Sequence, residues 1–526
     1  MTTIKETLVM LLLALPIGAA AQNPIIRDQF TADPTARVFN DKIYLYPSHD
    51  ILVPEGQRKD WFCMEDYHVF SSENLTDWTD HGIIVSQTQV PWGKPDGYSM
   101  WAPDCVFKDG RYYFYFPNSP KNGHGFAVGV ATADHPEGPF VCEPEPIKGI
   151  SGIDPCVLID DDGKAYIYWS GMGIRGAQLK ANMKEVEGEL QEVVMPKREG
   201  MTEMPPIKVA GKEMKGLPDG FKEGPFAFKR GGWYYLTFPW VRQENGTETL
   251  AYAMSKSPLG PWDFKGIFMA EHPNGCWTNH HSFVEYKGQW YLFYHTNFFS
   301  VSDDKRRSVC IEKVTFNADG TIQDVKPTMR GVGINKATEK IEFDRFSDAS
   351  TEVQTQYVDT SNYLRGAYVN LPQKGSWVRY TDVDFNCITD GYLIVCAKAN
   401  ENTEFYVHEK SCKGKIIAKI KITVKSEQGP FRRDQSNQWL TLTAPLQYMP
   451  KGVTDLCITC EGSEVSINWL QFKNRPKYFT PVKYNAVPSH PDEQGFIRRW
   501  TLLEPIRQDI RSNVIFTDTW LEEPFA

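Results

Sequence analysis

The sequence predicts an all-β protein that begins with a five-bladed β-propeller. Five segments repeat one pattern, in which an apolar strand, a polar turn of Gly, Asp or Asn and an aromatic strand follow one another. This pattern is the signal of a β-hairpin. The hairpins recur at intervals of roughly 50 to 70 residues with strand-like pieces between them, as expected for blades of four strands. The segments are "DPTARVFNDKIYLYPSHD", "APDCVFKDGRYYFYFPNS", "DPCVLIDDDGKAYIYWSG", "EGPFAFKRGGWYYLTFPW" and "HHSFVEYKGQWYLFYHTN".

Length and composition fit a globular protein of several domains. The chain has 526 residues, which is too long for one compact core. Hydrophobic residues make up 41% and charged residues 23%, both ordinary shares, whereas the aromatic share of 13% is high. Flat aromatic faces stack on sugar rings and similar ligands. The net charge of -9 argues against nucleic acid as a partner.

The first 21 residues resemble a secretory signal peptide. Lys5 precedes an apolar run from Leu8 to Leu15, and small residues follow at Ala19 to Ala21, so we expect cleavage after Ala21. A membrane anchor is the alternative, but the run falls short of the roughly 20 residues that span a bilayer. We therefore expect a secreted or periplasmic protein with no integral membrane span after cleavage.

The cysteines do not form the pattern of a disulfide framework. Eleven cysteines are spread thinly over the chain, and an odd number leaves at least one unpaired. We expect most of them to be buried apolar residues. Cys457 and Cys460 are close enough in sequence to suggest a pair under oxidising conditions.

Aligning the hairpins on the residue after each turn brings ionisable side chains to one position. Asp33, Glu223 and His280 each lie nine residues upstream of that residue, and Asp154 lies ten upstream across a longer turn. The second hairpin has Ala102 there. Because the innermost strand of every blade begins or ends at the central channel, we expect the four ionisable side chains to share a pocket.

The chemistry of this set depends on the carboxylates. A single Asp-Pro would more often cap a turn or pair with a nearby cation, but four convergent positions favour a site. Carboxylates held close together repel one another, so one can stay protonated while another is ionised. Such a pair is what glycoside hydrolysis requires.

Over about residues 23 to 333 the sequence resembles glycoside hydrolase family 43. The resemblance is carried by "FTADPTARVF", "WAPDCVF", "GIDPCVLIDDDGKAYIYWSG", "FKEGPFAF", "HHSFVEYKGQWYLFYH" and "RRSVCIEKVTFNADGTI". It implies a five-bladed propeller, about residues 22 to 335, that hydrolyses glycosidic bonds with inversion. It assigns the general base to Asp33 and the general acid to Glu223. Asp154 would orient that acid and raise its pKa.

The resemblance also implies residues that bind substrate. Arg307 matches an arginine that contacts sugar hydroxyls in this family, and its neighbour Arg306 is the alternative. Trp101, beside the Ala102 position, is a candidate stacking platform for a sugar. Aromatic residues are more often part of a core, which is the competing interpretation of Trp101.

His280 matches a histidine that in many family members binds a calcium or other ion on the propeller axis, directly or through water. A lone histidine is more often a hydrogen-bonded residue of the channel, and the alignment favours His280 over His281 as the residue that points inward. Any such Ca²⁺ would have a structural or electrostatic role, and no organic cofactor is indicated.

Residues of about 340 to 473 resemble a family 6 carbohydrate-binding module, which is a β-sandwich of the jelly-roll type. The resemblance rests on "IEFDRF", "GSWVRYTDVDF", "NQWLTLTAPL" and "SINWLQF". It implies that Trp439 and Tyr368 sandwich a sugar ring and that Asn468 binds its hydroxyls. Residues 474–526 form a linker and C-terminal extension, or the start of a further domain.

Together these features predict a glycosidase of the α-L-arabinofuranosidase or β-xylosidase type. Its substrate would be a plant cell-wall oligosaccharide or polysaccharide such as arabinoxylan. Two alternatives stay open: a hydrolase of the same family directed at arabinan or galactan, and a non-catalytic propeller that only binds glycans. The presence of all three carboxylates argues against the second alternative.

Overall fold

The structure, a computed structural model, describes residues 23–171, 173–193, 207–209, 212–214, 223–241, 247–271, 276–301, 303–424 and 437–475. The predicted signal peptide, residues 1–21, lies outside this part of the chain, as do all but the first two residues of the predicted extension 474–526. The described residues form β-strands and two short 3₁₀ helices, so the predicted all-β class is confirmed. None of the described helices is long and apolar enough to cross a membrane.

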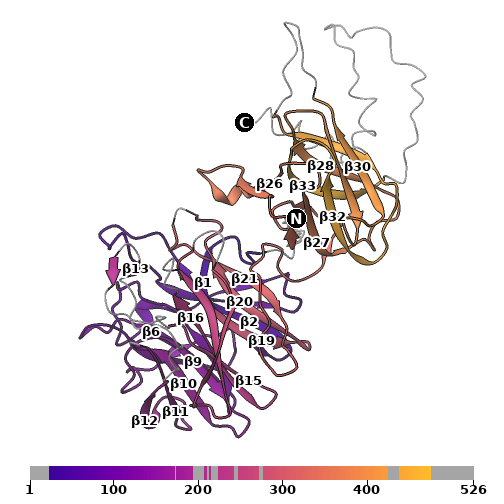
Figure 1. Ribbon diagram of the computed structural model, residues 1–526. Helices are drawn as coiled ribbons and strands as arrows, with labels where there is room; N and C mark the ends of the chain where they lie inside the picture. Colours follow the sequence, from indigo (N-terminus) through magenta and orange to yellow (C-terminus); the bar gives the residue numbers. More distant parts are fainter. Residues whose placement is uncertain are drawn as a thin grey trace, which may run out of the picture.

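Each of the five predicted hairpins lies in a small antiparallel sheet of its own (Figure 1). In the described residues, four of these sheets have four strands and the fifth has three. The strands are β1 (Phe30–Phe39), β2 (Lys42–Asp50), β3 (Asp66–Ser72) and β4 (Thr79–Ser86); β5 (Asp104–Lys108), β6 (Arg111–Asn118), β7 (Ala127–Ala133) and β8 (Val141–Cys142); β9 (Ile153–Ile159), β10 (Ala165–Ser170), β11 (Ile174–Leu179) and β12 (Val186–Glu192); β15 (Phe226–Arg230), β16 (Trp233–Val241), β17 (Glu248–Ser255) and β18 (Asp263–Met269); and β19 (His281–Tyr286), β20 (Gln289–Thr296) and β21 (Ser308–Val314). A separate pair, β13 (Ile207–Val209) and β14 (Lys212–Met214), lies between the third and fourth sheets in sequence, and the short helix η1 (Gln87–Gln89) follows β4.

Turn chemistry explains four of the five hairpins. The two residues between the strands both have positive φ at Asn40–Asp41, Asp109–Gly110, Gly231–Gly232 and Lys287–Gly288. This backbone matches the right-handed twist of the flanking strands, and Asn, Asp and Gly adopt it at low cost. The turn between β9 and β10 is longer, as predicted, and has Gly163 at φ 78°.

The first and last of these sheets are neighbours. Strand β1 packs against β19, β20 and β21. The N-terminal segment extends this contact, because Ile25 N–H donates to the Val309 carbonyl at 2.9 Å and Thr31 N–H donates to the Arg307 carbonyl at 2.8 Å. These bonds join the beginning of the described chain to β21, so residues nearly 300 positions apart form one wall of the same site.

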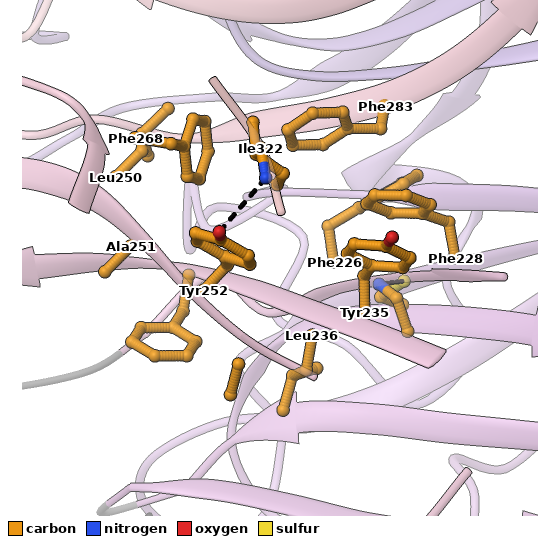
Figure 2. Packing of buried hydrophobic residues seen from close by; sticks show 14 of the residues in the cluster. Phe226, Phe228, Tyr235, Leu236, Leu250, Ala251, Tyr252, Phe268, Phe283 and Ile322 are labelled. Carbon is orange, nitrogen blue, oxygen red and sulfur yellow. Dashed lines mark hydrogen bonds between the residues drawn. The ribbon is translucent and has the colours of Figure 1, made fainter. Parts of the chain in front are cut away.

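Aromatic side chains fill the space between the fourth and fifth sheets (Figure 2). Phe228 stacks on Tyr235 at a centroid distance of 4.6 Å and on Phe283 at 4.8 Å. Tyr252 is buried nearby, and its hydroxyl accepts a hydrogen bond from Ile322 N–H at 3.0 Å, the dashed line in Figure 2. This packing fixes the two sheets that carry Glu223 and His280 at their edges.

The C-terminal part consists of two six-stranded sheets that share one buried core. One sheet contains β22 (Asn335–Lys336), β24 (Asp348–Ala349), β27 (Trp377–Asp384), β29 (Thr403–Glu409), β30 (Ile416–Ile422) and β32 (Val453–Cys460). The other contains β23 (Ile341–Glu342), β25 (Gln354–Tyr357), β26 (Ala367–Leu371), β28 (Gly391–Lys398), β31 (Leu440–Pro445) and β33 (Val465–Asn474). The short helix η2 (Tyr363–Arg365) precedes β26. Because β22 already pairs with β27, the change from one part to the other comes before Asn335.

The suggested pairing of Cys457 with Cys460 is wrong. Cys457 forms a disulfide with Cys412, 45 residues away in sequence, and Cys460 is free. Both residues of the suggested pair lie on β32, where residues three apart point to opposite faces and are about 10 Å from each other. Of the nine free cysteines described, six are buried, which agrees with the expectation for the remainder.

The two parts of the chain contact each other beside β20. Phe298 and Phe299, just after that strand, form a buried cluster with Ala367, and Tyr357 packs against it. The Tyr357 hydroxyl donates to the Phe298 carbonyl at 2.8 Å, and the Arg345 guanidinium lies 4.8 Å from the centre of the Phe298 ring. The chain runs on from Phe299 to Arg307. The C-terminal part therefore supports a loop that leads to the candidate site.

Candidate active site

Two of the predicted acids occupy the same unusual backbone position in their sheets. Asp33 on β1 has φ 45°, and Asp154 on β9 has φ 56°. Each is followed by proline and stands at a β-bulge, where the register with the neighbouring strand shifts. Asp tolerates the left-handed region better than most residues, and a bulge turns a side chain away from its regular direction. The sequence Asp-Pro thus aims the same kind of side chain from two different sheets.

Asp33 is held by an ion pair with Arg307. The Arg307 Nη1 atom lies 2.9 Å from Asp33 Oδ1, and both side chains are almost fully buried. The backbone N–H of Asp33 donates to His295 Nδ1 at 3.1 Å. The ion pair fixes the carboxylate of Asp33, and the hydrogen bond to His295 fixes its backbone.

A second carboxylate, Asp50 at the end of β2, orients the arginine. Arg307 Nε and Nη2 each bind one Asp50 oxygen at 2.9 Å, a bidentate contact that fixes the guanidinium plane. Burial lowers the pKa of Arg307, but Asp33 and Asp50 outweigh it and raise that pKa above its ordinary value. Burial raises the pKa of Asp50, and Arg307 opposes this rise.

Asp154 accepts two hydrogen bonds on one oxygen. The Ser170 hydroxyl and the Gly224 N–H both donate to Asp154 Oδ2 at 3.0 Å. Burial raises the pKa of Asp154 to about 7, although the nearby His280 lowers it, and the charges of Glu223 and Asp33 add to the rise. Because like charges oppose each other's ionisation, Glu223 and Asp33 help Asp154 to keep a proton near neutral pH.

Glu223 comes directly before Gly224, so the same hydrogen bond holds it beside Asp154. Burial raises the pKa of Glu223 well above its ordinary value, and Glu248 and Asp33 raise it further. A carboxyl group of this kind keeps its proton at a pH where an ordinary glutamate has lost it. It has the property that a general acid needs.

Sequence reasoning missed Glu248, the first residue of β17. Its side chain is fully buried, and one carboxylate oxygen accepts the Asn279 N–H at 2.6 Å. Burial raises its pKa to about 8. It lies close enough to Glu223 for the two groups to affect each other's ionisation. The pair therefore retains a proton near neutral pH.

His280 stands at the same edge. Neither of its ring nitrogens has a hydrogen-bond partner among the described residues, although both are shielded from solvent. The ring packs against Gly224, where an added Cβ atom would lie 2.8 Å from His280 Cδ2. His281, by contrast, is fully buried in β19, with Nε2 2.6 Å from the Thr237 hydroxyl. Burial and His280 lower the pKa of His281 well below its ordinary value.

The two candidate arginines have different surroundings. Arg307 is in the acid cluster, as described, whereas Arg306 is partly exposed and pairs with Asp303 at 2.9 Å. At the Ala102 position of the second hairpin, the acid comes two residues later: Asp104 is fully buried and binds Arg37 through both oxygens. Asp104 also accepts Val157 N–H at 2.6 Å, so it joins sheets below the site.

Trp101 belongs to an aromatic group near Arg307. Its ring lies 5.0 Å from Trp61 and 4.6 Å from Phe126, and its Nε1–H donates to the Phe62 carbonyl at 3.2 Å. The Arg307 guanidinium lies 4.9 Å from the centre of the Phe62 ring. The side chain of Trp101 is half-buried, so one part packs and another is open to a ligand.

A pocket of about 500 Å³ opens beside Glu223. Its wall combines apolar surface with a cation, and its lining includes Phe126, Ile153, Trp169, Ser170, Arg175 and Glu223. This volume suits a small ligand or a few sugar units. Glu223 and Ser170 connect the pocket to the acid cluster.

In the C-terminal part, two of the three predicted sugar-binding residues lie together. The rings of Tyr368 and Trp439 are in edge-to-face contact at 5.2 Å, and Lys398 Nζ lies 4.7 and 5.0 Å from their centres. A ring held between two others needs them about 7 to 8 Å apart, so the observed pair leaves no room for a sandwiched sugar. Asn468 stands at a bulge between β28 and β33, and its carbonyl accepts Phe343 N–H at 2.7 Å.

Comparison with known proteins gives a consistent result for the first part of the chain. A family model described as "Glycosyl hydrolases family 43" matches residues 21–322. "Xylosidase/arabinosidase 43A" of Humicola insolens is 36% identical over 342 residues, covering 58% of this chain and 99% of that protein. "Xylosidase/arabinosidase" of Bacteroides ovatus is 35% identical over 320 residues, covering 57% and 95%. A solved structure of CoXyl43, a β-xylosidase/α-arabinofuranosidase from a compost metagenome in complex with xylotriose in a calcium-free form, is 34% identical, covers 59% of this chain and 98% of its own, and has a TM-score of 0.49.

Proposed function

The chain belongs to glycosyl hydrolase family 43 and is a glycosidase, and we propose that it removes arabinofuranosyl or xylosyl residues from plant hemicellulose such as arabinoxylan. The observation that carries the proposal is the set of three carboxyl groups formed by the buried Asp33 and Asp154 and the partly exposed Glu223, which lines the pocket. Within it, the pKa of Glu223 is raised well above its ordinary value, while Asp33 is held in an ion pair. Hydrolysis of a glycoside needs one protonated and one ionised carboxyl group.

The roles follow from these two states. We assign Asp33 as the general base, which takes a proton from a water molecule as the water attacks the anomeric carbon. Glu223 is the general acid, which gives its proton to the departing glycosidic oxygen. The bond to the leaving group breaks as the bond to water forms, so the configuration at the anomeric carbon inverts. Asp154, bonded to Gly224 N–H at 3.0 Å, positions Glu223, whose pKa is raised by burial, Glu248 and Asp33.

Arg307 and Trp101 are the proposed contacts to the sugar. Arg307 is buried and binds Asp33 and Asp50, and its remaining guanidinium N–H groups can donate to hydroxyls of a sugar that reaches Asp33. Trp101 offers an aromatic surface next to Phe126, which lines the pocket and lies 4.6 Å from it. We expect the substrate to be a neutral sugar rather than an anionic one, because the acid cluster would repel an anion.

His280 is the proposed ligand of a calcium or other cation. Its two shielded ring nitrogens lack a hydrogen-bond partner among the described residues, and a cation bound directly or through water would supply one. Such an ion would contribute positive charge near Asp154. An ion held by one imidazole and water molecules would have a structural or electrostatic role.

We further propose that the five small sheets are the blades of a single propeller, within about residues 22–335. The two six-stranded sheets of about residues 340–473 would be a β-sandwich that binds carbohydrate through Tyr368, Trp439 and Asn468. The aromatic pair lies on one sheet, with Trp439 36% exposed. Binding there would use the open face of a ring, or would require the pair to separate. Residues 1–21 are proposed to direct secretion or export to the periplasm.

Two chromogenic substrates test the activity. The purified chain should release 4-nitrophenol from the α-L-arabinofuranoside, the β-D-xylopyranoside or both. Release from neither, with hydrolysis of linear arabinan or galactan, would shift the substrate to those polymers. Binding of xylo-oligosaccharides without hydrolysis of any of these substrates would support the non-catalytic alternative.

A further inference from the structure

A second group of metal-ligating side chains lies away from His280. His49 is near the end of β2, and Asp66 and His68 are on β3, two residues apart and hence on one face. Their candidate ligand atoms all lie within 4.8 Å of one another, and no other group of three or more is found in the part of the chain that the structure describes. We propose that His49, Asp66 and His68 bind one divalent transition-metal cation of the Zn²⁺ class.

The side chains of this triad, His49, Asp66 and His68, lie within reach of a single ion. His49 Nδ1 and Asp66 Oδ1 share a hydrogen bond of 2.7 Å, which a bound metal would replace, and His68 Nε2 lies 3.9 Å from the same oxygen. Ligands about 2.0–2.1 Å from a tetrahedral metal are about 3.3 Å apart. The two separations bracket this value, so small side-chain rotations would complete the site without moving the strands.

Asp80 supports His68 through the ring nitrogen that does not face Asp66. Its Nδ1 atom lies 3.0 Å from both oxygens of Asp80, and Asp80 in turn accepts Gly82 N–H at 2.7 Å and Gln29 Nε2–H at 3.1 Å. A carboxylate only accepts hydrogen bonds, so His68 donates from Nδ1 to Asp80, and Nε2 is the ring nitrogen that faces Asp66. A carboxylate behind a histidine ligand is the usual support of a metal site.

In the neutral imidazole with its proton on Nδ1, Nε2 is an acceptor, as the Asp66 carboxylate is, and a cation between the two would bind both. The side chains are 22%, 8% and 15% exposed for His49, Asp66 and His68, so an ion can enter from solvent. Two imidazoles and one carboxylate favour Zn²⁺, Co²⁺ or Ni²⁺ over Ca²⁺, which takes six to eight oxygen ligands.

The triad closes the base of a loop that reaches the candidate active site. His49 and Asp66 flank residues 51–65, which include Trp61 and Phe62. Trp61 contacts Trp101, and Phe62 lies against Arg307. A metal that bridges β2 and β3 would join the two ends of this loop and restrict its aromatic residues. The proposed metal site does not depend on the proposed substrate of the glycosidase.

Metal binding to the full chain, after removal of ions with a chelator, tests the proposal. Zn²⁺ titrated by calorimetry should bind with one equivalent at the triad, and Co²⁺ should give the visible absorption of a four-coordinate site. His49→Gln and His68→Gln should each abolish the Co²⁺ spectrum. Asp80→Asn should weaken Zn²⁺ binding roughly 10- to 100-fold, because it removes only the support behind His68.

Two variants serve as controls, and both should keep the Co²⁺ spectrum. His135→Gln removes an exposed histidine in another part of the chain. His280→Gln removes the residue proposed above as the ligand of a calcium or other cation. Circular dichroism melting separates loss of binding from loss of folding, and Asp80→Asn keeps the test valid if a ligand variant fails to fold. No Zn²⁺ binding to the wild-type chain, or binding that survives in the double variant of His49 and His68, would overturn the proposal.

Discussion

The backbone N–H of Gly224 donates a 3.0 Å hydrogen bond to the Oδ2 atom of Asp154, and this contact joins two sheets at the acid cluster. The residue before Gly224 is Glu223, so the backbone position of the proposed acid depends on a neighbouring acid. Gly224 adopts φ 51°, and its missing side chain lets His280 approach. One glycine thus sets the place of three ionisable groups.

Gly224→Ala should lower kcat severalfold or more while the protein stays folded. The added Cβ would lie 2.8 Å from His280 Cδ2 and 3.0 Å from Pro239 Cδ, so the loop with Glu223 must shift. The matched control is Gly231→Ala, which has φ 56° but nothing within 4 Å of an added Cβ. Both variants carry the backbone strain of about 1–2 kcal/mol. Equal activity in the two variants would show that the approach to His280 does not matter.

Glu248→Gln should move the alkaline limb of the pH profile of kcat/KM to lower pH. The Glu248 charge raises the pKa of Glu223, so a neutral amide lowers that pKa and the acid loses its proton earlier. Glu189→Gln, an exposed glutamate on β12, is the control. An unchanged alkaline limb in Glu248→Gln would remove Glu248 from the site.

The same variant should change stability with a definite sign. Because the pKa of Glu248 is raised from 4.5 to about 8, its contribution is fully present at low pH and is lost as pH rises through that range. As the pH rises from 4.5 to about 8, the free energy of unfolding should therefore fall less for Glu248→Gln than for the wild type. Urea unfolding at several pH values measures this.

Tyr357→Ala should lower kcat/KM although Tyr357 lies outside the propeller sequence. The substitution removes the hydrogen bond to the Phe298 carbonyl and the ring contact at 5.4 Å, and so loosens the segment that leads to Arg307. Stability should fall by up to about 3 kcal/mol, since the ring is half-buried. Tyr363→Ala removes a ring 4.7 Å from Tyr357 and should affect stability more than activity. If both variants kept wild-type kcat/KM, the C-terminal part would not support the loop.

Trp439→Ala should weaken retention on insoluble xylan by on the order of 1–3 kcal/mol, the scale of a lost stacking contact. Melting temperature should change little, because Trp439 is 36% exposed rather than buried between the sheets. Hydrolysis of a small soluble substrate should stay near the wild-type rate. Unchanged retention would mean that Trp439 and Lys398 form a surface contact with no role in binding.

The hairpins were predictable because each is a local feature. Turn residues such as Asp109–Gly110 specify their own backbone, and alternating apolar and aromatic residues specify the strands. Aligning the hairpins led to Asp33, Asp154 and Glu223, but their offsets differ in the structure. Gly232 belongs to the turn and pairing resumes at Arg230 and Trp233, so Glu223 lies ten residues before the second strand of its hairpin, whereas Asp33 lies nine before Lys42.

The partners of these acids could not be found in the same way. Asp50, Ser170 and Glu248 lie at the end of a second strand or the start of a third, and antiparallel strands return to the same edge. Aligning only the first strand of each hairpin therefore misses them. The Cys412–Cys457 disulfide and the contact of Phe298 with Tyr357 join residues 45 or more positions apart, and nothing in the local sequence marks them.

The most direct test of the proposed mechanism is the kcat of Asp33→Asn on the better of the two chromogenic substrates. Asn accepts φ 45°, and Asp50 still pairs with Arg307, so the pocket should keep its shape and KM and melting temperature should stay near wild type. Asp109→Asn, with φ 50° in a turn, is the matched control and should have wild-type activity. We predict that kcat of Asp33→Asn falls roughly 10²- to 10⁴-fold, because the attacking water loses its proton acceptor. Near-normal turnover by Asp33→Asn would contradict the assignment of Asp33 as general base and, with it, the proposed mechanism.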